Sequence, residues 1–156
     1  MVDPFSHHPN LRSFIKPSKD SFFRTITTEQ VKEMLANSSL PLTLEFYDDE
    51  TRETLRRKAL ANHKGDLLIF AYGSLIWDPA LEFSGIRHAF APKHQRRFIL
   101  VDTHGGRGTA EAPGLMAALD NGKGCEGFAF KISAEKVETE TEILFRREMI
   151  APGYHA

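Results

Sequence analysis

Residues 66–156 hold several short strand patterns followed by one helical pattern, and this order most constrains the fold. Leu67–Ala71 is a continuous apolar run, as expected of a buried strand. Ile86–Pro92 and Arg96–Asp102 are further strand candidates, rich in Ile, Val and Phe. Two more, Leu115–Leu119 and Gly127–Ile132, flank a turn signal. A helical pattern covers Ser133–Ile150, with Ser133 as its N-cap. Because no helix alternates with the strands, we expect an α+β domain with a mostly antiparallel sheet or barrel and a helix packed on it.

Residues 1–65 lack the strand patterns of the later residues and are predicted to form an N-terminal arm with two short helices. The first 25 residues carry three prolines among polar side chains, which is typical of irregular structure. Thr27–Gln30 fits a capping box at the start of the first helix. The second helix is expected from about Asp48 to His63, since acids open it, bases close it and Gly65 follows it.

The segment Asp120–Gly124 is a turn signal between two strand candidates. It reads Asp-Asn-Gly-Lys-Gly, and Asn-Gly favours the positive φ angles of tight hairpin turns. We therefore expect Leu115–Leu119 and Gly127–Ile132 to pair as a hairpin.

A second turn, Tyr72–Leu75, comes directly after the first strand candidate. A tight turn there brings consecutive backbone N–H groups to one place, and Gly73 allows a close approach and a positive φ. Such a turn can bind a carboxylate or a developing oxyanion without a charged side chain. An ordinary strand-to-loop turn is the alternative, and the residues alone favour it.

Glu148 is placed by its spacing on the apolar face of the last helix. That face holds Val137, Thr141, Leu144, Phe145 and Glu148. The opposite, exposed face holds Glu135, Glu138, Glu140 and Glu142. Burial and the helix C-terminus both disfavour a charged carboxylate, so they raise its pKa towards the range of a general base. The alternatives are a frayed, solvent-exposed helix end and a buried salt bridge with Arg146, Arg147 or Arg96–Arg97.

Charge and cysteine content exclude several classes of protein. The 156 residues carry 20 basic and 21 acidic side chains, which gives no electrostatic reason to expect nucleic acid or a membrane as partner. A lone cysteine, Cys125, cannot form an internal disulfide and fits a reducing compartment. One cysteine and histidines without paired spacing predict no metal site. No apolar stretch approaches the roughly 20 residues that span a bilayer, and the polar start lacks a signal-peptide core. We expect a soluble cytoplasmic protein.

Five segments taken together identify a family. They are Phe70–Trp77 with Asp78-Pro79, Arg96-Arg97-Phe98, Gly106–Thr109 with Pro113-Gly114, Gly124–Gly127, and Arg146–Met149 with Gly153-Tyr154. In this combination, residues 67–155 resemble the ChaC family of γ-glutamylcyclotransferases, which degrade glutathione. Two positions depart from the pattern, because Ala71 stands where many members carry glycine and Leu115 where relatives commonly carry arginine.

The resemblance implies a barrel-like sheet with a catalytic helix and a defined reaction. The α-amine of glutathione attacks its own γ-amide carbonyl, which forms 5-oxoproline and releases Cys-Gly. Glu148 is implied as the general base, with neither cofactor nor metal. The implied substrate-binding residues are Ala71, Tyr72, Gly73, Ser74, Leu75, Ile76 and Tyr154.

The resemblance also implies a longer domain, because members of the family continue well past the position of Tyr154 with further strands and a terminal helix. We therefore expect the chain to hold the family's fold without its C-terminal part. Two other functions remain open. One is a catalytically inactive module that binds γ-glutamyl groups or other proteins, and the other is a cyclotransferase for other γ-glutamyl peptides or amines.

Overall fold

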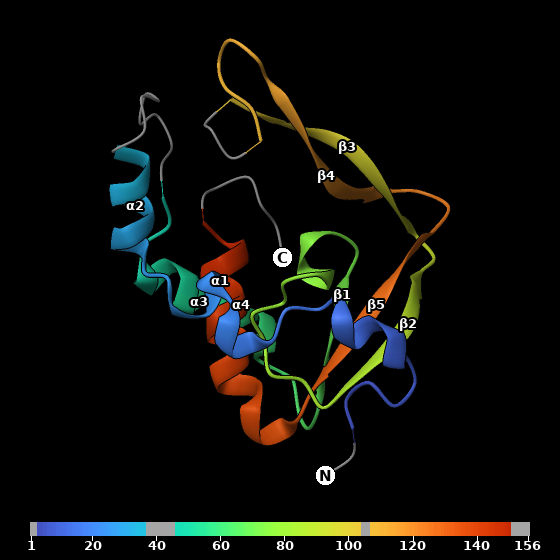
Figure 1. Cartoon of the computed structure of the whole chain (residues 1–156). Helices are drawn as coiled ribbons and strands as arrows, with labels where there is room; N and C mark the ends of the chain where they lie inside the picture. The colour runs from blue at the N-terminus through green and yellow to red at the C-terminus, as the bar shows by residue number, and fades with distance from the viewer. Residues whose placement is uncertain (1–2, 37–45, 104–106, 151–156) are drawn as a thin grey trace.

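Two antiparallel β units organise the molecule, for which we used a computed structural model that describes residues 3–36, 46–103 and 107–150 (Figure 1). The first unit is a three-stranded sheet of order β1-β5-β2. Its strands are β1 (Leu67–Ala71), β5 (Cys125–Ile132) and β2 (Gly85–Ala91). The second unit is a two-stranded ribbon of β3 (His94–Asp102) and β4 (Gly114–Asn121). The α+β prediction is confirmed, but the described strands do not close into a barrel.

The two β units are halves of one long, bent hairpin. β2 continues into β3 and β4 continues into β5, while β2 pairs with β5 and β3 with β4 (Figure 1). The predicted hairpin between Leu115–Leu119 and Gly127–Ile132 is therefore wrong, since these segments lie in β4 and β5 and pair with other strands.

The Asn-Gly segment instead makes the bend between β4 and β5. The Gly122 N–H donates to the Lys93 carbonyl at 3.0 Å across the bend. The positive φ falls on Gly124, at 146°, where an added Cβ would lie 2.1 Å from the Phe90 ring. A bend of this kind and a hairpin turn both need such a glycine. The sequence therefore located a change of chain direction correctly but predicted a hairpin turn in place of a bend.

Helices cover the N-terminal region and the end of the described chain. They are α1 (Phe22–Thr25), α2 (Thr28–Ala36), α3 (Asp49–Leu60) and α4 (Val137–Glu148). The predicted capping box is confirmed, because the Thr27 N–H donates to Gln30 at 2.9 Å and the Gln30 N–H donates to Thr27 at 3.2 Å. Ser133 makes no side-chain cap bond at the short 3-10 helix before α4. Asp66 accepts from the Ala134 N–H at 2.9 Å in its place.

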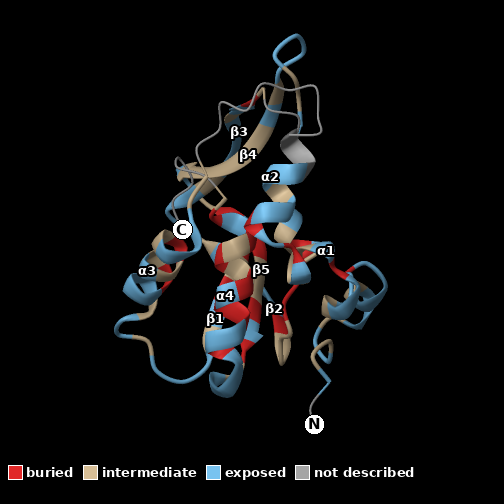
Figure 2. Ribbon diagram, turned by 90° about the vertical axis from the view of Figure 1, so that its left-hand side faces the viewer, coloured by how far each residue is buried: buried red, intermediate tan, exposed pale blue. Residues whose placement is uncertain are grey.

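The β1–β5–β2 sheet buries one face. Ile69 and Ala71 of β1 share that face with Phe130 and Ile132 of β5, because alternate strand residues point the same way. At one end the face packs against Val137 and Ile143 of α4, together with Ala80 and Leu81. At the other end it packs against Ile15 of the N-terminal region and Ile76. Figure 2 shows the buried residues gathered where α4, the sheet and the N-terminal region meet.

Candidate functional site

The glycine loop, residues Tyr72–Leu75, leaves β1 and enters a short 3-10 helix, Ser74–Ile76. Gly73 adopts φ −143°, so the predicted positive φ is wrong at this glycine. A Cβ added to Gly73 would meet no atom within 4 Å. The glycine therefore leaves the loop backbone open to close approach, which is the second property that the sequence predicted.

Two backbone donors of the glycine loop have no hydrogen-bond acceptor among the residues that the structure describes. The Ile76 N–H donates to the Gly73 carbonyl at 2.9 Å, and the Trp77 N–H donates to the Ser74 carbonyl at 3.1 Å. In contrast, no hydrogen bond within the described ranges uses the N–H of Ser74 or Leu75. These groups open the 3-10 helix, where N–H groups lack partners within the helix. Two adjacent free donors suit an anionic oxygen.

Arg147 joins the last turn of α4 to the glycine loop. Its Nη2 donates to the Ser74 hydroxyl at 3.4 Å, across 73 positions of sequence. The side chain is 4% exposed, and its Cζ lies 4.8 Å from the centre of the Phe23 ring. Burial lowers the pKa of the Arg147 guanidinium, and the charge of Asp78 partly offsets that effect. The glycine loop and the end of α4 are thus in direct contact.

Glu148 does not face the core, contrary to the sequence-based prediction. Its side chain is 45% exposed and lies against Arg147 Nη1, without the alignment of a hydrogen bond. This position matches the alternatives of an exposed helix end and a pairing with Arg147. α4 ends at this residue, whose neighbours Arg147 and Met149 are both buried.

The buried carboxylate of α4 is Glu140, which the helical pattern placed on the exposed face. Glu140 is 1% exposed, and its two oxygens accept from Arg24 at 2.9 and 3.0 Å. It also accepts from the Glu82 N–H at 2.9 Å. A fully hydrogen-bonded carboxylate can be buried at modest cost. Helical periodicity alone could not identify this partner in the N-terminal region.

Of the remaining predicted site residues that the structure describes, two are buried and two are half-buried. Ala71 and Ile76 are buried in the core and support the glycine loop from below. The Tyr72 carbonyl accepts from Arg96 Nη1 at 2.8 Å, which ties the loop to the β3–β4 ribbon. Leu75 is half-buried. Tyr154 lies outside the described residues.

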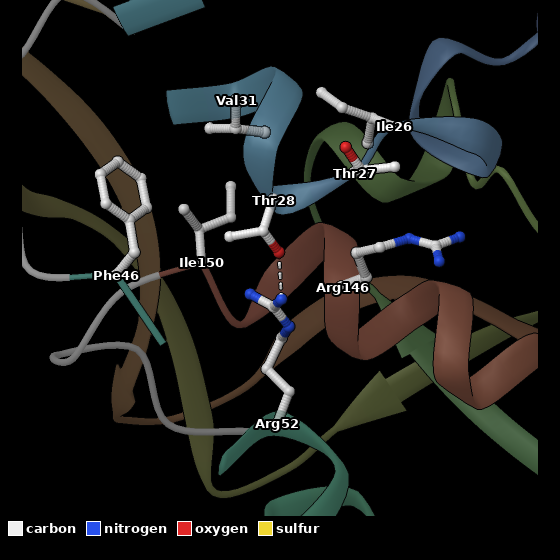
Figure 3. A pocket seen from close by; sticks show the side chains of 8 residues that line it. All are labelled: Ile26, Thr27, Thr28, Val31, Phe46, Arg52, Arg146 and Ile150. Atoms are coloured by element: carbon white, nitrogen blue, oxygen red, sulfur yellow. Dashed lines mark hydrogen bonds between the residues drawn. The ribbon is translucent and has the colours of Figure 1, made fainter. Parts of the chain in front are cut away.

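A small cavity lies between α2, α3 and α4, away from the glycine loop (Figure 3). Its lining residues are Ile26, Thr27, Thr28, Val31, Phe46, Arg52, Arg146 and Ile150. The volume of about 10 Å³ suits no more than about one water molecule, so this cavity cannot hold a peptide substrate. Figure 3 shows that Arg52 donates to the Thr28 hydroxyl there.

Within the described ranges, no group of three or more His, Cys, Asp or Glu side chains is arranged to hold a metal ion. Among these residues, no helix is long and apolar enough to cross a membrane.

The fold and site define an α+β domain whose glycine loop meets an arginine-glutamate pair at the end of a helix. Comparison with known families is more specific. Residues 67–156 match the family model described as ChaC-like protein, and the chain belongs to that family.

Its relatives carry a common name. The glutathione-specific gamma-glutamylcyclotransferase of Escherichia coli is 43% identical over 91 residues, which are 58% of this chain and 39% of that protein. The human glutathione-specific gamma-glutamylcyclotransferase 1 is 37% identical over 90 residues, 56% of this chain and 40% of that protein. The Schizosaccharomyces pombe relative of the same type is 33% identical over 109 residues, 60% of this chain and 52% of that protein. The chain thus spans about half or less of the length of these relatives.

Proposed function

We propose that this domain is a γ-glutamylcyclotransferase that degrades glutathione in the cytoplasm to 5-oxoproline and Cys-Gly. One observation carries the proposal. The region that matches the family contains both the glycine loop and Glu148, and the bond from Arg147 to Ser74 brings the two together. The names of the relatives support the substrate class.

The reaction needs a base and no protein nucleophile. The α-amine nitrogen of the γ-glutamyl group bonds to the γ-carbonyl carbon, and the amide bond to the cysteinyl nitrogen then breaks. The attacking nitrogen loses a proton and the leaving nitrogen gains one, so a single carboxylate can accept the first and return the second. We assign this role to Glu148, whose half-exposed side chain is reachable from solvent beside the glycine loop.

We assign to the glycine loop the role of binding the oxyanion that develops during the reaction. The γ-carbonyl oxygen gains negative charge as the ring closes, and the free N–H groups of Ser74 and Leu75 are donors of the right kind. The open space beside Gly73 allows the substrate to reach these donors. Binding that folds the γ-glutamyl chain towards its own amine would add an entropic advantage. Tyr154 is assigned to the same substrate site.

The test is a turnover assay on this chain with purified glutathione, following 5-oxoproline and Cys-Gly together. Equal release of both products is expected. Release of neither from a folded sample would contradict the proposal, and binding of glutathione without turnover would favour the inactive binding module. Faster turnover of γ-glutamyl-alanine than of glutathione would move the substrate to other γ-glutamyl peptides.

A further inference from the structure

Residues 3–26, the first part of the N-terminal region and called the arm from here on, hold the exit of the glycine loop. The Lys16 N–H donates to the Trp77 carbonyl at 2.8 Å, and Lys16 Nζ pairs with Asp78 Oδ2 at 3.1 Å. The preceding side chain, Ile15, is buried in the same cluster as Ile76. Two consecutive residues of the arm thus fix the loop by a main-chain bond, an ion pair and an apolar contact.

The arm also reaches the last turn of α4 through α1. The Phe23 ring lies 4.8 Å from Arg147 Cζ, within the range of a cation–π contact. The carbonyl of Arg24 accepts from Arg146 Nη2 at 2.9 Å. The Arg24 guanidinium binds Glu140 of α4 and the Ala80 carbonyl, which follows the glycine loop. Both halves of the site therefore rest on the arm.

Arg147 has few other groups to orient it. Its Nε and Nη1 are buried and make no hydrogen bond with the residues that the structure describes. The one hydrogen bond that it makes to a described residue, Ser74, is long at 3.4 Å. A desolvated cation over an aromatic face is held more strongly than an exposed one. The Phe23 ring is therefore one of the groups that orient the guanidinium, together with Glu148, which contacts Nη1, and the charge of Asp78.

We propose that Phe23 and Lys16 of the N-terminal arm are positioning residues of the γ-glutamyl site, Phe23 through Arg147 and Lys16 through Asp78. This inference rests on the proposed function for its catalytic consequence. The arm lies outside residues 67–156, which match the family model, so the match does not assign it any role. The arm thus helps to fix the geometry of the site in this chain.

Four variants of the whole chain separate positioning from bulk stability. Phe23→Leu keeps an apolar side chain and removes the ring, whereas Phe23→Tyr keeps the ring. Lys16→Met keeps the apolar stem and removes the charge, whereas Lys16→Arg keeps the charge. The matched controls are Phe14→Leu and Lys19→Met, since both positions are exposed on the same arm and make none of these contacts.

The first readout needs no turnover. Amide hydrogen exchange of Ile76, Trp77 and Asp78, whose N–H groups donate to carbonyls of the glycine loop, is expected to speed up at least about fivefold in Phe23→Leu and Lys16→Met, because a loosened loop opens more often. The two controls and the two conservative variants should stay within about twofold of the wild type. Unchanged exchange in both Phe23→Leu and Lys16→Met would overturn the inference.

The second readout is steady-state kinetics with glutathione. Phe23→Leu should lower kcat/KM by about 5- to 30-fold, whereas Phe23→Tyr, which keeps the ring, should have a kcat/KM close to that of the wild type. In an Arg147→Gln background the same change should add less than about twofold, because Phe23 acts through that arginine. Full multiplication of the two effects would contradict the route through Arg147. Faster loop exchange in a chain that never turns over glutathione would retain the positioning role and reject the proposed function.

Discussion

The β1–β5–β2 sheet and the β3–β4 ribbon are continuous in sequence, yet they differ in what covers them. Phe130 of the sheet is 0% exposed, whereas Phe98 of the ribbon is 66% exposed. The ribbon further exposes Ile99, Val101 and Leu115. Both units are paired antiparallel along their strands, with a register shift between Phe98 and Leu100 in the ribbon, so strand pairing alone does not explain the difference in burial. Among the described residues, the buried clusters join α4 and the N-terminal arm to the sheet and include no residue of the ribbon (Figure 2).

The candidate site lies on the covered unit, the β1–β5–β2 sheet. The glycine loop leaves β1, and its supporting side chains Ala71 and Ile76 belong to the buried cluster. The ribbon reaches the site by Arg96, which donates to the Tyr72 carbonyl at 2.8 Å. A reacting group held by a packed scaffold keeps its geometry better than one on an open ribbon. The covered sheet should therefore govern activity and stability, and the ribbon should affect both much less.

The largest expected effect is on turnover at the covered unit. Glu148→Gln removes the proposed base and should lower kcat for glutathione by about 10²- to 10⁴-fold, while calorimetry still detects glutathione binding. Val101→Thr, an exposed change of similar size on the ribbon, should leave kcat within about twofold. Retained turnover in Glu148→Gln would mean that another group is the base. A large loss of kcat in Val101→Thr would mean that the ribbon governs activity as well as the sheet.

The next effect is on folding stability. Phe130→Ala leaves a cavity in the buried face of the sheet and should lower the free energy of unfolding by about 3–5 kcal/mol. Phe98→Ala removes the same ring from an exposed ribbon position and should cost less than about 0.5 kcal/mol. Urea unfolding followed by circular dichroism measures both. Equal losses would mean that the ribbon face is covered in solution.

A smaller effect tests the link between the two units. Arg96→Met removes the bond to the Tyr72 carbonyl and should raise KM for glutathione about two- to fivefold with little change in kcat. Arg97→Met is the matched control, since Arg97 pairs with Asp120 within the ribbon at 2.8 Å. Similar KM values for the two variants would show that the ribbon does not support the loop.

The same contrast explains which features could be predicted from the sequence. Strand patterns located all five described strands, because alternation and β-branched residues are local properties. They could not tell that Asp120–Gly124 makes a bend, since pairing partners depend on distant residues. Nor could they distinguish buried from exposed strands, because coverage comes from the arm and α4.

Predictions for the site failed for a related reason. The glycine loop was found from a local signal, the glycine that follows a buried strand. Helical spacing placed Glu148 inside and Glu140 outside, whereas the structure has the reverse. The partner that buries Glu140 is Arg24, which lies 116 positions away. A charged side chain becomes buried where a partner exists, and periodicity within one helix does not contain that information.

The smallest expected effect concerns acid stability at the helical side of the covered unit. The guanidinium groups of Arg56 and Arg57 lower the pKa of Glu53 from 4.5 to about 2. Arg56 also binds Glu138 of α4, so this cluster joins α3 to α4. A carboxylate with a lowered folded-state pKa stabilises the fold above its unfolded pKa, and that contribution is lost as the pH falls through the folded value. Tm should therefore decrease as the pH is lowered from about 5 to about 2.

Glu53→Gln isolates this contribution because it removes the titrating group and keeps the side-chain shape. The variant should have a lower Tm than the wild type at pH 6, by a few degrees at most, because Glu53 is partly exposed to solvent. The difference should shrink towards pH 2, where the wild-type carboxylate also becomes neutral. Asp120→Asn on the ribbon is the control, and its Tm should stay close to that of the wild type throughout. A gap between Glu53→Gln and wild type that is constant with pH would mean that the α3–α4 junction is not held by this charge cluster.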